Sequence, residues 1–288
     1  IKLDNMITNM RFFLQMDILS ELPESDFYKD EQEKLLLSYR AHKLKNKPYL
    51  VFLHGYNGNS KSWAYQFRFF KEKYSLITID FPGFGRSENM EDSNMFRVAD
   101  MIYRFLKNNN IINFSLVGHS MGGMLAQVIS AKYPESITKL ILSCTHTGYN
   151  LPNKSPLRQP YLDRLQQRKV MSDKEYGLLR IKKMLPKLKN QKILEFLAKI
   201  SEEITQQSIL CGGTAMQILN TKELLNKIHS PCLILTGSDD VVVSKEKSSI
   251  LISEIKHSIH KEISGVGHAP YCEDQEKFNN YIDTFLNS

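Results

Sequence analysis

The chain alternates short apolar runs with helix-like stretches, and this alternation constrains its fold more than any other feature. Five runs are typical of buried parallel strands, since each is mainly apolar and only five or six residues long. These runs are Tyr49–His54, Leu76–Asp80, Phe114–Gly118, Lys139–Cys144 and Cys232–Gly237. The helix-like stretches are Ser62–Lys71, Ser93–Asn108, Met121–Tyr133, Ser244–Ile255 and Asp274–Leu286. The pattern predicts an α/β fold with a mostly parallel sheet and helices on both faces.

Two regions depart from this alternation. An earlier and more polar run, Lys34–Arg40, suits a strand at the edge of the sheet. Residues 147–222 are strand-poor, interrupted by prolines, and contain a capping box at Ser172–Glu175 ahead of the helical stretch Tyr176–Met184. We therefore expect a core made of residues 1–146 and 223–288, with a helical lid of three or four helices inserted at 147–222.

The positive charge of the chain is concentrated in the expected lid. The net charge is +7 over 288 residues. Residues 147–222 hold 14 Lys and Arg against 6 Asp and Glu, a balance of +8, so the rest of the chain sums to about −1. A solvated, lysine-rich helical surface is the simpler interpretation. Nucleic-acid binding is disfavoured, because no basic motif interleaved with aromatic residues is present.

A G-x-S-x-G sequence, Gly118-His-Ser120-Met-Gly122, lies directly between a predicted strand and a predicted helix. A tight turn there needs small residues on both sides of the serine, because side chains would clash. The turn also places the hydroxyl at a helix N-terminus, where developing negative charge is favoured. This context predicts Ser120 as a nucleophile.

A serine nucleophile needs a base, and among eight histidines His268 is the best placed. It lies in a glycine-containing loop, Gly265–His268, directly after the strand-like Lys261–Ile263. A loop at the end of the last strand can bring an imidazole over the sheet edge. His54 is followed by Gly55 and suits a backbone role, whereas His119 is adjacent to the serine and should point elsewhere.

The acid that orients this histidine is expected at a strand end between the serine and the histidine in the chain. Gly237-Ser-Asp239-Asp240 follows the last of the five apolar runs and offers two carboxylates. The end of the preceding strand, Ser143–His146, carries none. Asp239 or Asp240 is therefore the predicted acid.

Together these motifs resemble the α/β-hydrolase family over nearly the whole chain. Leu53-His-Gly-Tyr56 is similar to the family's oxyanion segment, and Asp80-Phe-Pro-Gly-Phe-Gly-Arg-Ser87 to its D-x-x-G-x-G-x-S turn. Gly237-Ser-Asp-Asp240 resembles its G-x-x-D acid motif, which selects Asp240. The resemblance is closest to carboxylesterases and enol-lactonases.

The resemblance implies acyl transfer to water, with Ser120 as nucleophile, His268 as base and Asp240 as its orienting acid. The backbone N–H groups of Tyr56 and Met121 are expected to stabilise the oxyanion, by about 3 kcal/mol per donor. This mechanism needs no metal or organic cofactor.

The substrate is expected to be a small-molecule carboxylic ester or lactone. Two other enzymes remain open: a carbon–carbon bond hydrolase, and an esterase similar to pimeloyl-[acyl-carrier-protein] methyl ester esterases. In the second case an acidic carrier protein would meet the basic lid residues Arg164, Arg168, Lys169, Arg180, Lys182 and Lys183. A non-enzymatic alternative is a ligand receptor derived from a hydrolase.

The remaining sequence features bear on location. The four cysteines are scattered, which disfavours a disulfide framework or a zinc site. No apolar run approaches the roughly 18 residues needed to cross a bilayer. Ile1–Ser20 mixes charged residues into its apolar positions, unlike a secretory signal, and its apolar spacing suggests a short amphipathic helix. We expect a cytoplasmic protein.

Overall fold

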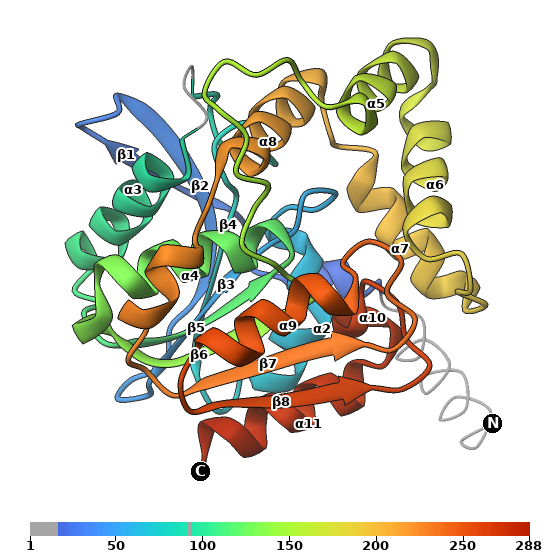
Figure 1. Ribbon diagram of the computed structural model, residues 1–288. Coiled ribbons are helices and arrows are strands. Elements are labelled where there is room, and N and C mark those ends of the chain that lie inside the picture. Colours follow the sequence, from blue (N-terminus) through green and yellow to red (C-terminus); the bar gives the residue numbers. More distant parts are fainter. Residues whose placement is uncertain (1–16, 91–93) are drawn as a thin grey trace, which may run out of the picture.

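A central sheet organises the molecule (Figure 1). The computed structural model describes residues 17–90 and 94–288, and within these ranges the sheet has eight strands in the order β1-β2-β4-β3-β5-β6-β7-β8. The expected N-terminal amphipathic helix lies largely outside these ranges. The strands are β1 (Asp26–Asp30), β2 (Leu35–His42), β3 (Tyr49–Leu53), β4 (Ser75–Ile79), β5 (Phe114–His119), β6 (Ile137–Ser143), β7 (Cys232–Gly237) and β8 (Ser258–Ile263).

The sheet is mostly parallel, as the alternation predicts. Strands β3 to β8 pair in parallel. The short apolar runs of β3 to β7 are mostly buried because helices cover both faces, whereas β8, at the other edge of the sheet from β1, is polar and mostly exposed. The expectation that residues 34–40 form an edge strand is wrong. β2 lies between β4 and β1, and β1 pairs with it antiparallel. The polar sequence Asp-Phe-Tyr-Lys-Asp of β1 is tolerated because it is the true edge.

Helices pack on both faces of the sheet and create two hydrophobic cores. Successive strand residues point to opposite faces, so Val51 and Leu53 belong to one core while Leu50 and Phe52 belong to the other. On the first face lie α3 (Met95–Asn108), α4 (Met121–Lys132) and α9 (Lys245–Glu254). On the second lie α2 (Ala64–Phe70), α10 (Pro270–Glu273) and α11 (Gln275–Leu286). Short 3-10 turns complete the core: η1 (Ile18–Glu21), η2 (Ser60–Trp63), η3 (Pro134–Ser136) and η4 (Lys222–Lys227).

The segment between β6 and η4 is helical, and all of its residues are described. Its four helices are α5 (Gln159–Val170), α6 (Asp173–Met184), α7 (Gln191–Ser201) and α8 (Gln206–Ile218). Figure 1 shows them together beyond one end of the sheet. The predicted capping box is present at the start of α6, where Ser172 and Glu175 bond each other's backbone N–H. We refer to residues 147–222 as the lid segment, and its division from the core remains a prediction.

None of the described helices is both long and apolar enough to cross a lipid bilayer.

Candidate active site

Ser120 lies at a sharp turn between β5 and α4. Its backbone has φ 51° and ψ −116°, a conformation that L-residues rarely adopt. The turn fits only because its neighbours are glycines: a Cβ on Gly118 would lie 2.4 Å from the Gly122 carbonyl oxygen, and one on Gly122 would lie 2.2 Å from that of Leu53. The turn therefore exposes the hydroxyl at the N-terminus of α4, as the G-x-S-x-G context predicts.

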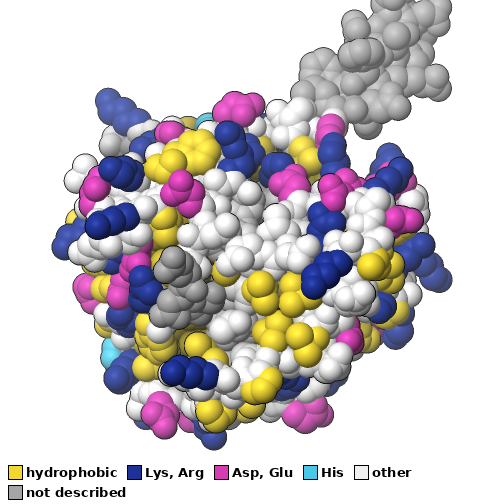
Figure 2. Space-filling model, turned by 90° about the horizontal axis from the view of Figure 1, so that it is seen from above, with side chains coloured by type: hydrophobic (Ala, Val, Ile, Leu, Met, Phe, Trp, Pro, Cys, Tyr) yellow, Lys and Arg dark blue, Asp and Glu magenta, His cyan; other side chains and the backbone are white. Residues whose placement is uncertain are grey.

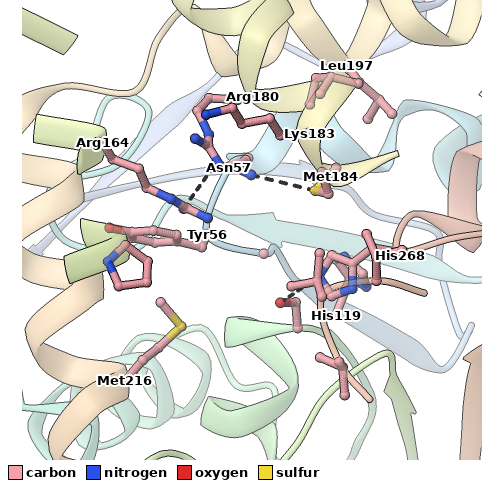
Figure 3. A pocket seen from close by; sticks show the side chains of 18 of the residues that line it. Tyr56, Asn57, His119, Arg164, Arg180, Lys183, Met184, Leu197, Met216 and His268 are labelled. Carbon is pink, nitrogen blue, oxygen red and sulfur yellow. Dashed lines mark hydrogen bonds between the residues drawn. The ribbon is translucent and has the colours of Figure 1, made fainter. Parts of the chain in front are cut away.

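The structure brings His268 and Asp240 to this serine from two neighbouring strands. Asp240 follows β7 and His268 follows β8, and these strands are paired in parallel. The His268 Nε2 lies 3.0 Å from the Ser120 Oγ, and the His268 Nδ1 lies 2.9 Å from an Asp240 carboxylate oxygen. Figure 3 shows His268 at the pocket, close to His119. Asp239 instead contacts the lid segment, 3.1 Å from the Lys187 Nζ.

Asp240 is held as a carboxylate in a largely buried position. Burial alone would raise its pKa, but the adjacent His268 and two backbone donors lower the pKa overall. The N–H groups of Val242 and Val243 donate to one carboxylate oxygen at 2.8 and 3.0 Å. The other oxygen is thereby left for the imidazole, which fixes the orientation of the ring.

A second carboxylate, Glu273 at the end of α10, bonds the backbone of the loop that carries His268. The N–H of Gly267 donates to both of its oxygens at 3.0 Å, and the N–H of Ala269 donates at 3.0 Å. These bonds fix the backbone on both sides of His268. Burial raises the pKa of Glu273. Sequence reasoning missed this residue, and its spacing of five from the histidine was the available signal.

The backbone N–H groups of Tyr56 and Met121 are the expected oxyanion donors. In the described parts of the chain, neither N–H donates a hydrogen bond to another protein group. The loop that carries Tyr56 is anchored to the lid segment. The Tyr56 hydroxyl donates to the Ile209 carbonyl at 2.7 Å, and the Ser201 hydroxyl donates to the Asn57 carbonyl at 2.8 Å. The Tyr56 N–H is thus a free donor on a loop anchored to the lid segment, and the Met121 N–H is a free donor on the residue directly after Ser120.

The D-x-x-G-x-G-x-S turn and His54 support this loop from within the core. Asp80 accepts from the Ser60 N–H at 2.6 Å, and the Ser87 hydroxyl donates to the Asp80 carbonyl at 2.6 Å. His54 is fully buried, and its Nε2 accepts from the Phe81 N–H at 3.1 Å. Burial lowers the pKa of His54 to about 4, so the ring stays neutral. The two ring nitrogens of His54 therefore bond backbone groups, those of Gly55 and Phe81, and take no part in the proton-transfer chain.

A model of the alpha/beta hydrolase fold family matches residues 48–275, which is most of the chain. The chain belongs to the α/β-hydrolase family. A "Putative esterase/lipase" from Haemophilus influenzae is 25% identical over 287 residues, covering 91% of this chain and 94% of that protein.

Solved structures share the fold of this α/β hydrolase. An enol-lactonase from Burkholderia xenovorans superposes with a TM-score of 0.80 at 15% identity, covering 91% of this chain and all 100% of that one. An esterase from Exiguobacterium antarcticum gives 0.81 at 19% identity, covering 92% and 100%. The predicted fold class and family are confirmed, as is the prediction of an enzyme that hydrolyses esters.

A cavity of about 350 Å³ opens above Ser120, between the core and the lid segment of this α/β hydrolase (Figure 3). Its size suits a small molecule. The core contributes Ser120, His119 and His268, together with His146, which lies shortly after β6. No sequence motif indicated that His146 would lie in the site. The lid segment contributes Tyr149, Arg158, Pro160, Tyr161, Arg164, Arg180, Ile181, Lys183, Met184, Leu197, Ile200 and Met216.

The basic residues of the lid segment are divided between its surface and this cavity. Arg164, Arg180 and Lys183 line the cavity, although Lys183 is also exposed, while Lys169 and Lys182 are exposed and lie outside the lining. Arg168 bonds the Ile204 carbonyl at 2.7 Å and pairs with Asp173. Figure 2 shows basic side chains interspersed with acidic ones on the face that it views. The interpretation of this charge as only a solvated surface is therefore incomplete.

Cys144 lies beside the histidine and its acid. Its thiol and the ligand-type atoms of Asp240 and His268 all lie within 4.8 Å of one another, so these three could reach one metal ion. Burial raises the pKa of the Cys144 thiol, whereas a metal ligand must be deprotonated. The imidazole and the carboxylate are also already bonded to each other. The arrangement favours proton transfer from a hydroxyl over metal binding.

Proposed function

We propose that this α/β hydrolase cleaves a carboxylic ester or lactone of a small molecule by transferring the acyl group through Ser120 to water. One observation carries the proposal: the buried chain from the Ser120 hydroxyl through His268 to Asp240, with distances of 3.0 and 2.9 Å. This is the geometry in which a histidine can remove the hydroxyl proton while a carboxylate stabilises the resulting imidazolium.

The reaction proceeds in two halves. The Ser120 oxygen attacks the carbonyl carbon while His268 Nε2 takes the hydroxyl proton, and the carbonyl oxygen accepts from the N–H groups of Tyr56 and Met121. When the intermediate collapses, the bond to the alcohol breaks and His268 returns the proton to the leaving oxygen. Water then repeats the sequence on the acyl-serine, releasing the acid and restoring the hydroxyl.

We further propose that residues 147–222 act as the lid of this site. Two hydrogen bonds, from Tyr56 to Ile209 and from Ser201 to Asn57, join the oxyanion loop to α7 and α8. A movement of these helices would therefore disturb the oxyanion donors as well as open the cavity.

The nucleophile is tested by Ser120→Ala. Activity on 4-nitrophenyl acetate should fall about 10⁵-fold, because the remaining site supplies only binding and oxyanion contacts. A fluorophosphonate probe should label the wild type but not the variant. Ser130→Ala is the matched control, a buried serine on the same helix α4, and it should keep both labelling and activity. Labelling that persists in Ser120→Ala would place the nucleophile elsewhere.

A further inference from the structure

Arg180 is a buried cation at the cavity. Its side chain comes from α6, and the residue is only 8% exposed. One guanidinium nitrogen donates to the Gln167 side chain at 3.2 Å, and its Nε has no hydrogen-bond partner. Within residues 17–90 and 94–288 no carboxylate pairs with it. A buried charge without a counter-charge is costly, so an unpaired one at a cavity wall requires an explanation.

The neighbouring cations increase this imbalance. Arg164 stacks on the Tyr56 ring at 4.6 Å and donates to the Asn57 side chain at 3.3 Å, a neutral acceptor. Arg158 stacks on the Tyr149 ring at 3.8 Å. Burial, and then repulsion from Arg164, lower the pKa of Arg180 to about 10. No described residue that lines the cavity is acidic. Figure 3 shows Arg164 and Arg180 converging near Asn57.

Two other arginines of the chain show how a buried or partly buried guanidinium is satisfied within the protein. Arg104 forms two bonds of 2.9 Å with the buried Asp30. The buried Arg40 has no carboxylate, but its Nε donates to the Ser60 hydroxyl at 3.3 Å and a terminal nitrogen donates to the Pro23 carbonyl. A guanidinium presents a planar fork of donors that fits a carboxylate or phosphate group. Arg180 has the same fork and faces the cavity with donor capacity left over. Arg180 differs from Arg104 in having no carboxylate partner, and from Arg40 in that its Nε has no hydrogen-bond partner and it lines the cavity.

We propose that Arg180, assisted by Arg164, binds an anionic oxygen group of the substrate, so that the preferred esters carry a carboxylate or phosphate away from the scissile bond. The proposal rests on the ester hydrolysis proposed above. The cavity volume of about 350 Å³ limits such substrates to small molecules. A bound anion would replace the missing counter-charge, and a neutral ester of the same length would leave Arg180 unpaired.

Binding is measured separately from turnover, in the Ser120→Ala background. Monoethyl esters of straight-chain dicarboxylic acids, from succinate to suberate, are compared with the matching diethyl esters by calorimetry. We expect at least one monoester to bind about 10- to 100-fold more tightly than its diester, the range of a hydrogen bond to a charged group. The same comparison is made for phosphate, with short-chain monoacylglycerol phosphates against the matching monoacylglycerols. The anion that gives the larger ratio of charged-ester to neutral-ester affinity is the one that the site recognises.

Arg180→Gln should abolish this preference while changing diester binding less than about threefold. The matched control is Lys182→Gln, an exposed lysine on the same helix outside the cavity lining, and it should keep the preference. Arg180→Met tests folding: removing an unpaired buried charge should leave the melting temperature unchanged or higher. If neither arm shows a preference for the charged ester, or if Arg180→Gln keeps it, the proposal is wrong.

The outcome is distinguishable from a failure of the proposed function. Binding by the Ser120→Ala protein does not depend on turnover. If the charged esters bind selectively but the wild type hydrolyses none of them, the anion site stands and ester hydrolysis does not. If the wild type hydrolyses these esters but the Ser120→Ala protein binds neutral and charged esters equally, ester hydrolysis stands and the anion site does not.

Discussion

The floor and the roof of the cavity differ in how their charges are satisfied. On the floor, supplied by the core, Asp240 and Glu273 each have several hydrogen-bond donors, and His268 is bonded on both ring nitrogens. On the roof, supplied by the lid segment, Arg164 and Arg180 find only neutral acceptors. The charged groups of the floor are satisfied without a ligand, whereas the roof lacks an anion.

This difference separates two tasks. A proton-transfer chain must be pre-organised, because a 1 Å displacement of a reacting group costs rate even when affinity is retained. A substrate-binding surface becomes more selective when it carries polar groups that only the correct ligand can pair, because the wrong ligand leaves those groups unpaired. Changes to the floor should therefore act on kcat, and changes to the roof on the choice between substrates.

The largest effect in this comparison is expected at Asp240. Asp240→Asn should lower kcat by about 10⁴-fold, because the amide no longer favours the correct tautomer and orientation of His268. Asp239→Asn should change kcat less than about threefold, since among the described residues its carboxylate contacts only Lys187, in a pair at the surface, and the Ser238 hydroxyl, and neither belongs to the proton-transfer chain. Steady-state kinetics on one neutral ester measure both. If Asp239→Asn gave the large loss and Asp240→Asn the small one, Asp239 rather than Asp240 would be the acid that orients His268.

An intermediate effect is expected at Glu273, a positioning residue. Glu273→Ala removes the three bonds that hold the loop on both sides of His268, and kcat should fall about 10-fold with KM nearly constant. Glu276→Ala is the matched control, an exposed glutamate on the next helix. An effect on KM alone, or an equal effect in the control, would contradict a role in orienting the histidine.

The smallest effect is expected in the lid segment at Ser172. Ser172→Ala breaks the capping box of α6 and should destabilise that helix by about 1 kcal/mol. Ser253→Ala in core helix α9 caps no helix and is the comparison. Trypsin cleavage within residues 159–218 should accelerate only in the Ser172 variant, with the melting temperature lowered by about 2–4 °C or less. Equal cleavage in both variants would argue against a lid that opens separately from the core.

The strands were predictable where burial is complete. Continuous apolar runs such as Leu76–Asp80 and Cys232–Gly237 have few alternatives to a central parallel strand, and the structure places strands there. β1 was not predictable, because Asp26–Asp30 is polar and needs β2 as a template. Missing it made β2 the expected edge. An edge strand is therefore the element that sequence composition identifies least well.

The floor of the site was predictable and the roof was not. Ser120, Asp240 and His268 each occur in a motif that directly follows a strand, and the structure brings the three together. The lid segment offered many cations, and only packing decides which of them face the cavity. One signal was available: Arg180 lies four residues after Tyr176 and four before Met184, on the buried face of α6, whereas Lys182 lies on the other.

The left-handed backbone of Ser120 has a consequence for the history of the chain. A non-glycine residue in such a conformation costs roughly 1–3 kcal/mol, a large part of the stability of an ordinary domain. Replacement by glycine would relieve that strain, so drift in a lineage released from catalysis would be expected to remove the serine. A chain that merely sensed ligands would have no reason to keep a hydroxyl there. A serine that holds this costly conformation and is aimed at a histidine is expected of a protein that catalyses turnover rather than of one that only senses ligands.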